Sequence, residues 1–283
     1  MAPPGHIESH GLTDIGKVRE VNEDQFLIAD VSKTMLVHQS SLSLEDQTRL
    51  YGGAHGQLLI VADGIGGRAA GKLASKIAVD TIASYMLNTI PWFLRLDEQN
   101  EDDFLDELKS VMERCQSSIQ ADAEVKLSHH GMGTTLTMAY VTWPRLYVIH
   151  VGDSRCYLLR RSKLEQITTD HTVAQQIVDA AGMRLKAVDS SQWSHILWNV
   201  IGGDTTDLQP EVYKTELKVG DTLLLCTDGL TGHVNDKNIT QCLQRQSLPE
   251  KPVRPLCAPP TRRAERTTLR RLWFVFTELI EMP

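Results

Sequence analysis

Hydrophobic residues recur along this chain with two spacings, the alternating or continuous spacing of buried strands and the three-to-four-residue spacing of amphipathic helices. Strands are predicted within residues 21–30, 57–63, 134–143, 145–160, 162–168 and 220–230, and helices within residues 68–87, 102–125 and 172–183. Strands therefore lie before and after a pair of long helices. This order favours an α+β fold with antiparallel sheets, because a parallel sheet requires regular alternation of strands and helices.

Two regions depart from these patterns. Residues 35–56 are mostly polar and end in glycines, which predicts a connection without regular structure. Beyond Gln246 the chain becomes rich in proline and arginine, and six of its eleven prolines lie at or after Pro249. We therefore predict one main domain at residues 1–246 and an atypical tail at residues 247–283.

Two Asp-Gly pairs follow the most apolar strand patterns. Asp63 and Gly64 end the run LLIVADG, and Asp228 and Gly229 end the run LLLCTDG. An isolated Asp-Gly pair is most often a turn. Two pairs that each end a buried strand predict that carboxylates from distant parts of the chain meet. Carboxylate oxygens are hard ligands that suit Mg²⁺ or Mn²⁺.

The composition excludes several function classes. A formal net charge of -7 argues against a basic surface that would bind the phosphates of a nucleic acid. The five cysteines are scattered without CxxC spacing, which predicts neither a disulfide framework nor a zinc site. No run of about 18 apolar residues occurs, and the first residues lack the pattern of a secretory signal. These observations favour a cytoplasmic protein that binds neither nucleic acid nor a membrane.

Five short motifs follow one another along the chain: VREVNED at 18–24, VADGIGG at 61–67, GMGTTL at 131–136, VGDSRCYLL at 151–159 and LLLCTDGL at 223–230. Their order and spacing resemble the metal-dependent protein phosphatases of type 2C, in the form common among free-standing prokaryotic enzymes. The resemblance implies a four-layer α-β-β-α sandwich, in which two antiparallel sheets are flanked by helix pairs. It also implies that the protein removes phosphate from phosphoserine and phosphothreonine in proteins phosphorylated by a serine/threonine kinase. We expect it to act as a monomer.

The resemblance assigns roles to the carboxylates of these motifs. It implies two Mn²⁺ or Mg²⁺ ions, with Asp63 bridging both, Asp228 completing one and the backbone carbonyl of Gly64 binding the other. Glycine suits this position on physical grounds, because it lets a carbonyl approach an ion without a Cβ in the way. By the same resemblance, Glu23 and Asp24 act largely through water. Neighbouring strand positions point to opposite faces, so one side chain can hold a water that the other orients.

Arg19 matches the arginine that binds the substrate phosphate, a task that suits a fixed guanidinium fork. The implied reaction is direct attack on phosphorus by a hydroxide bound to both ions, without a phosphoenzyme. Some relatives carry a histidine as a candidate acid where this chain has Ile65, so we expect metal-bound water to protonate the leaving oxygen. Residues 169–203 occupy the place of the family's flap, which covers the metal cleft and varies in its contacts.

Some of these motifs have ordinary structural interpretations. VGDSR can be a plain hairpin in which Asp153 only supports the site. His129 and His130 stand where some relatives place an aspartate for a third ion, but a surface pair of histidines is the simpler interpretation. GIGGRA fits a loose dinucleotide fingerprint, yet the carboxylate ahead of its first glycine is unfavourable beside a pyrophosphate, and the acidic residue expected after a second strand is missing.

One motif of the family is absent. The family ends with a strand preceded by GGxDN, whose aspartate is another ligand of the ion shared by Asp63 and Asp228, and no such motif follows Asp228 here. Residues 263–276, RAERTTLRRLWFVF, can be encoded so that a neighbouring frame reads GGADNATAALVRF. We therefore hypothesise that the residues after about Gln246 are a shifted translation of the native ending, which leaves the fold without its closing strand. The alternative is a catalytically impaired scaffold that binds phosphoproteins.

Overall fold

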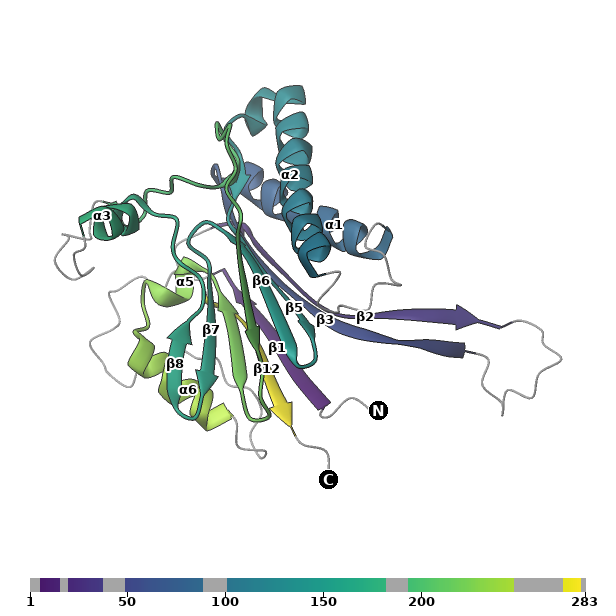
Figure 1. Cartoon of the computed structure of the whole chain (residues 1–283). Helices are drawn as coiled ribbons and strands as arrows, with labels where there is room; N and C mark the ends of the chain where they lie inside the picture. The colour runs from purple at the N-terminus through teal and green to yellow at the C-terminus, as the bar shows by residue number, and fades with distance from the viewer. Residues whose placement is uncertain are drawn as a thin grey trace.

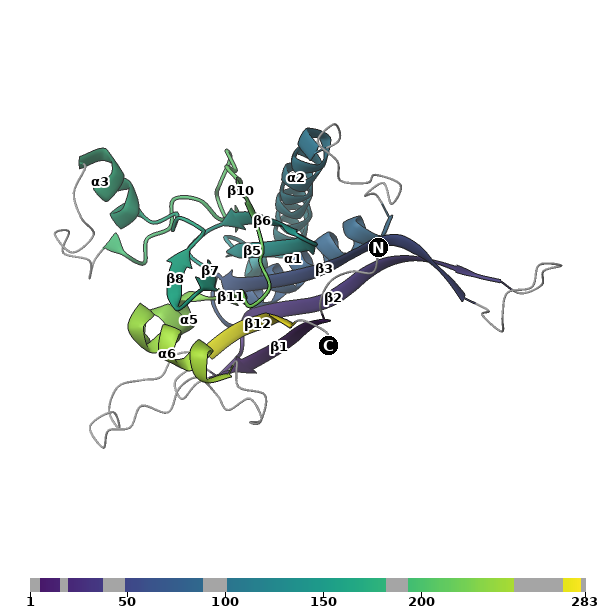
Figure 2. The same ribbon diagram turned by 60° about the horizontal axis from the view of Figure 1, so that its bottom comes forward.

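The computed structural model of the chain describes residues 6–15, 20–37, 49–88, 101–181, 193–246 and 272–280. Two antiparallel sheets pack face to face, with α1 (Arg68–Asn88) and α2 (Glu101–Val125) over one sheet and α5 (Asp228–Thr231) and α6 (Asp236–Gln246) beside the other (Figure 1). The view in Figure 2 shows the same layers from below. The expected four-layer α-β-β-α sandwich is confirmed.

The three predicted helices are present. They are α1, α2 and the short α3 (Val173–Ala181), which lies to one side of the layers (Figure 1), and a 3-10 turn, η1 (Leu127–His129), follows α2. Three acidic residues begin α2, where the helix dipole favours negative charge. Within the described residues, no helix combines the length and the apolar character needed to cross a bilayer.

The larger sheet carries the helices α1 and α2. Its strands follow the order β10-β6-β5-β3-β4-β9, and β2 also pairs with β3. The strands are β2 (Asp24–Leu36), β3 (Arg49–Ile65), β4 (Gly133–Thr134), β5 (Leu136–Thr142), β6 (Arg145–Val151), β9 (Ile201–Gly202) and β10 (Glu211–Glu216). The β2–β3 ladder reaches the pair Leu36 and Arg49. The connection predicted at residues 35–56 is therefore too long, because strand pairing continues into both of its ends.

The smaller sheet follows the order β1-β12-β11-β7-β8. Its strands are β1 (His6–Asp14), β7 (Arg155–Arg160), β8 (Lys163–Gln166), β11 (Thr222–Cys226) and β12 (Leu272–Ile280). The strand β12 pairs with β1 along its whole length and with β11 from Thr222 to Leu225. The expectation that the fold lacks a closing strand is therefore wrong, because residues 272–280 of the tail form a strand between β1 and β11. Residues 247–271 lie outside the described part of the chain.

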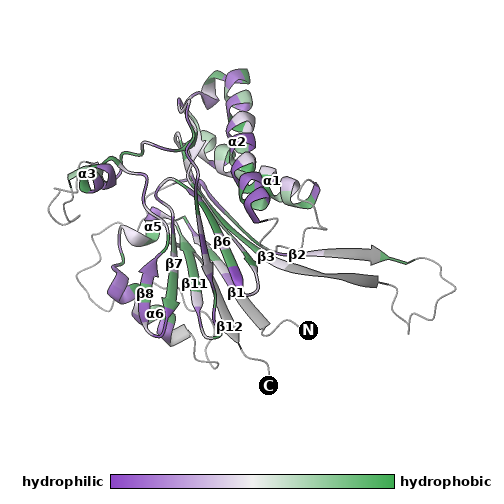
Figure 3. Ribbon diagram, in the orientation of Figure 1, coloured by the Kyte–Doolittle hydropathy of each residue, from purple (hydrophilic) through white to green (hydrophobic). Residues whose placement is uncertain are grey.

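Three apolar layers hold the sandwich together, one at each interface between neighbouring layers of secondary structure. Alternation along the strands creates them: Leu58 of β3 faces α1 and α2, whereas Leu59 faces the other sheet. In the same way, Leu225 of β11 faces the opposite sheet and Leu224 faces α6. The hydrophobic colour in Figure 3 accordingly concentrates on the central strands of both sheets.

The strand predicted at residues 145–160 is two strands in different sheets. The chain leaves β6 and crosses to β7 through Gly152, whose φ is 107°. A Cβ on Gly152 would lie 2.5 Å from the Cβ of Thr135, so neither the space nor the backbone conformation suits another residue. The crossing places the next residue, Asp153, at the boundary between the sheets.

The layer between the sheets should be the most sensitive to cavities. We expect Leu59→Ala to lower the free energy of unfolding by about 2–5 kcal/mol, because Leu59 is fully buried and its loss leaves a void. Leu87→Ala, at a side chain 65% exposed on α1, is the matched control and should cost less than about 1 kcal/mol. Urea denaturation of both variants measures the difference. Equal losses would contradict the layer assignment.

Candidate functional site

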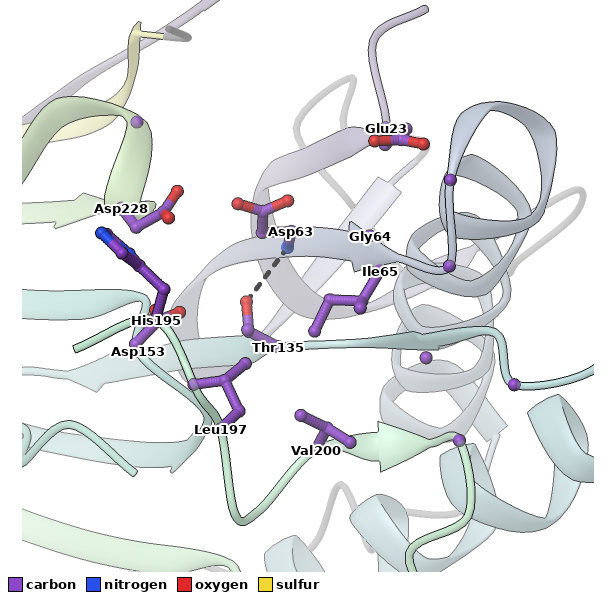
Figure 4. A pocket seen from close by; sticks show the side chains of 16 residues that line it. Glu23, Asp63, Gly64, Ile65, Thr135, Asp153, His195, Leu197, Val200 and Asp228 are labelled. Atoms are coloured by element: carbon purple, nitrogen blue, oxygen red, sulfur yellow. Dashed lines mark hydrogen bonds between the residues drawn. The ribbon is translucent and has the colours of Figure 1, made fainter. Parts of the chain in front are cut away.

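A cavity of about 500 Å³ opens beside the ends of β3 and β11. Four carboxylate residues line it, and they come from four separate parts of the chain: Glu23, Asp63, Asp153 and Asp228 (Figure 4). The two Asp-Gly pairs therefore meet at one cavity, as their positions after buried strands predicted. The topology explains the meeting, because β3 and β11 lie in sheets that pack against each other.

Hydrogen bonds from the GMGTTL motif fix the backbone of Asp63. The amide of Asp63 donates to Oγ1 of Thr135 at 3.2 Å, and the carbonyl of Asp63 accepts from the amide of Thr135 at 2.9 Å. Oγ1 of Thr134 also donates to that carbonyl at 2.9 Å. The hydroxyl of Ser154, from the VGDSR motif, lies 2.6 Å from Oγ1 of Thr135. The GMGTTL motif therefore supports Asp63 directly, and the VGDSR motif supports it through Thr135.

Gly64 occupies a position with no room for a side chain. Its amide donates to the carbonyl of Glu23 at 3.2 Å, and a Cβ would lie 2.0 Å from the carbonyl oxygen of Gly71 in α1. The start of β2, the end of β3 and the start of α1 thus approach one another through their backbones. Gly64 also lines the main cavity beside Asp63, so its backbone carbonyl is a candidate ligand there.

Glu23 and Asp24 lie on opposite sides of the chain. Glu23 is 1% exposed and lines the main cavity, while Asp24 is 2% exposed and lines a separate cavity of about 210 Å³ with Asn22 and Lys72. The alternation of strand side chains produces this division. The structure therefore brings Glu23, but not Asp24, to the lining of the main cavity. Arg19 lies outside the described residues.

Asp153 is a cavity residue as well as a neighbour of the supporting network. Burial raises its pKa from 3.8 to about 8, and the charges of Asp228 and Asp170 add to the rise. Arg155 opposes this rise, but its guanidinium is held by Asp170 in a bidentate pair with contacts of 2.5–3.0 Å. The crowding of carboxyl groups thus makes a negative charge on Asp153 unfavourable, and a bound cation would offset this effect.

Among the described residues, the possible metal ligands at the cavity do not form a closed cage. No three histidine, cysteine or carboxylate side chains in the described part of the chain converge as a closed metal cage. Mg²⁺ and similar hard ions are commonly bound by one or two carboxylates together with several waters. The donors that line the cavity are carboxylate oxygens and the backbone of Gly64, so they fit a water-rich site for such an ion.

Two alternative interpretations of the motifs are resolved by the geometry. Nδ1 of His129 lies 2.6 Å from Oδ1 of Asp122, and neither His129 nor His130 is among the described residues that line the cavity. The GIGG turn follows a strand of an antiparallel sheet, whereas a dinucleotide fold requires parallel strands.

One segment of the cavity wall has no motif in the sequence. His195, Leu197 and Val200 line the cavity from the stretch that follows α3. A bridge between Thr172 and Leu197 joins this stretch to the start of α3. The sequence predicted that residues 169–203 cover the cleft, but it did not identify which of them line it. An exposed loop has no periodic pattern from which the position of a side chain can be predicted.

Asp153→Asn should stabilise the metal-free protein, and by more at about pH 8 than at about pH 4. At pH values between 3.8, the ordinary pKa, and about 8, the pKa in the folded protein, Asp153 is protonated in the folded chain. In the unfolded chain it has lost this proton. Folding then takes up a proton, so the stability of the unmodified protein falls as the pH rises through this window. Urea denaturation in EDTA across this range measures the dependence. A gain that does not change with pH would contradict it.

Comparison with known proteins gives one consistent family. The model of the family described as Protein phosphatase 2C matches residues 37–272. The serine/threonine protein phosphatase PstP of Mycobacterium tuberculosis is 34% identical over 205 residues, which are 72% of this chain and 37% of that protein. The chain thus spans little more than a third of the length of PstP. The serine/threonine phosphatase stp of Listeria monocytogenes is 29% identical over 195 residues, 69% of this chain and 75% of that protein.

Solved structures agree with this result. The crystal structure of PstP from Mycobacterium tuberculosis aligns with a TM-score of 0.69 at 29% identity, over 98% of this chain and 99% of that one. A structure of the PstP catalytic domain in complex with two manganese ions aligns with a TM-score of 0.65 at 26% identity, over 97% of this chain and 99% of that one. With its fold, its motifs and these matches, the chain belongs to the protein phosphatase 2C family.

Proposed function

We propose that this protein is a metal-dependent phosphatase that hydrolyses phosphoserine and phosphothreonine in proteins. The observation that carries the proposal is the meeting of Asp63, Gly64 and Asp228 at one cavity between the sheets. The relatives named above are described as serine/threonine phosphatases, which supports the same substrate class. The cavity also opens to solvent beside loops, where a phosphorylated segment of another protein can enter.

Two Mn²⁺ or Mg²⁺ ions are the proposed cofactors. Asp63 would bridge them, Asp228 and the carbonyl of Gly64 would each hold one, and Glu23 would act through water from the same cavity. Asp24, which lines the neighbouring cavity, would act only through water. The relative bound to two manganese ions supports this number and this metal. When bound, such ions supply a hydroxide nucleophile at neutral pH and offset charge on the phosphate.

The residues of the chain then have separable tasks. Thr134, Thr135 and Ser154 hold Asp63 in place through the hydrogen bonds described above. Arg19 would bind the phosphate oxygens with its guanidinium fork. Leu197 and Val200 add an apolar part to the cavity wall.

The proposed partners are phosphorylated proteins, the products of a serine/threonine kinase. We propose that the chain acts on them as a monomer in the cytoplasm, without binding nucleic acid or a membrane. The negative charge of the chain supports the exclusion of nucleic acid, because the phosphates of such a partner require basic side chains on the protein.

We also propose that residues 247–283 are a shifted translation of the native end of the domain at residues 1–246. The position between β1 and β11 lies inside the smaller sheet, so the fold requires a strand there. The neighbouring frame supplies a strand together with GGxDN, whose aspartate would add a ligand to the ion of Asp228. The present tail fills the position without that aspartate.

The metal mechanism predicts loss of activity in Asp63→Asn. Hydrolysis of p-nitrophenyl phosphate with Mn²⁺ should fall by about 10²-fold or more, because asparagine keeps the size of the side chain but removes the bridging charge. EDTA should abolish the activity of the unmodified protein. Asp80→Asn, at an exposed carboxylate on α1, is the matched control and should retain full activity. Activity that survives EDTA, or that Asp63→Asn leaves unchanged, rejects the mechanism. A stable protein with no turnover points to the phosphoprotein-binding scaffold.

The shifted-frame hypothesis predicts a defined result at the DNA level. A single insertion or deletion between the codons of Gln246 and Arg263 should restore an open frame that contains Gly-Gly-x-Asp-Asn. The restored chain should also bind Mn²⁺ more tightly, because one more carboxylate would hold the ion. Sequencing the coding DNA tests the first statement, and calorimetric titration of both chains tests the second. If no single change restores the motif, the tail is the genuine end of the protein.

A further inference from the structure

His195 lies in the cavity although no motif contains it. It belongs to the segment after α3, and its side chain is exposed to solvent. Figure 4 shows the imidazole of His195 directed into the cavity toward Asp228. Among the described residues that line the cavity, His195 has the one side chain that contains nitrogen.

The backbone that follows His195 is held by hydrogen bonds to the start of α3 and the residues before it. The carbonyl of Ile196 accepts from the amide of Val173 at 2.9 Å, and the amide of Trp198 donates to the carbonyl of His171 at 3.1 Å. His171 is in turn joined to the crossing between the sheets, because its amide donates to the carbonyl of Gly152 at 2.7 Å. The position of His195 is therefore tied to the same crossing that carries Asp153.

The reaction requires a proton at the leaving oxygen, and two of the described lining residues can carry one, His195 and Asp153. Asp153 is buried, whereas His195 is exposed and can exchange its proton with solvent. Cleavage of a phosphoserine or phosphothreonine ester leaves a strongly basic alkoxide, and a positioned acid lowers the barrier of such a step. Ile65, which follows Gly64 on the cavity wall, is apolar and has no proton to give. Glu23, Asp63 and Asp228 are the groups proposed to serve the ions, and they do so as charged carboxylates.

We propose that His195, in place of the metal-bound water expected from the sequence, is a catalytic residue that protonates the leaving oxygen of the substrate. This inference rests on the proposed phosphatase function. As the attacking oxygen forms its bond to phosphorus, the bond from phosphorus to the serine or threonine oxygen breaks, and the released electron pair takes the proton of imidazolium. Solvent returns a proton to the neutral imidazole, which the exposure of His195 allows. An imidazole suits this exchange because its ring nitrogens can both donate and accept a proton.

The role of His195 can be tested with two substrates whose leaving groups differ in their need for a proton. p-Nitrophenolate is a weak base that departs without a proton, whereas the alkoxide of threonine does not. We expect His195→Gln to lower the single-turnover rate on a phosphothreonine peptide by about 10²–10⁴-fold, with a much smaller loss on p-nitrophenyl phosphate. Mn²⁺ affinity, measured by calorimetry on the full chain, should stay unchanged.

Ile196→Ala provides the control for the loop itself. Ile196 is the next residue, 46% exposed, and does not line the cavity, so this variant should keep the rates on both substrates. Equal losses on the two substrates in His195→Gln, no loss on either, or weaker Mn²⁺ binding would each overturn the assignment of His195 while the phosphatase function stands. Failure of the unmodified protein to hydrolyse either substrate with Mn²⁺ would instead overturn the proposed function, and the role of His195 with it.

Discussion

The backbone of Gly64 packs against the backbones of Glu23 and Gly71 with no space for a Cβ among them. Through this contact the end of β3, the start of β2 and the first turns of α1 come together at one point. The carboxylates of Glu23 and Asp63 flank the contact, so their positions follow from it. Any side chain at residue 64 would push these elements apart and move both carboxylates.

The site also depends on how the two sheets pack against each other. Leu59 of β3 and Leu225 of β11 belong to the same buried layer, and this layer brings the ends of the two strands to one cavity. Gly152 lets the chain pass from one sheet to the other at the edge of that cavity and delivers Asp153 there. Packing of apolar residues thus crowds carboxyl groups together, and a cation that binds the folded chain would stabilise it.

The sequence predicted the elements whose apolar patterns are strong and local. The helices α1 and α2, the strand β3 and the meeting of Asp63 with Asp228 all follow from spacing and from buried runs. The division at Gly152 could not be predicted in this way, because apolar residues continue on both sides and crowding against Thr135 decides the turn. His195 could not be placed either, since hydrogen bonds between distant backbones position its exposed loop.

The central claim is that Asp63 and Asp228 hold two divalent ions at the cavity. Crystals of the protein grown with Mn²⁺ and measured at the manganese absorption edge locate such ions directly by their anomalous scattering. We expect two peaks beside Asp63, one of them also within ligand distance of Asp228 and the other beside the carbonyl of Gly64. The absence of a peak at Asp63, or manganese bound only elsewhere on the molecule, would contradict the claim.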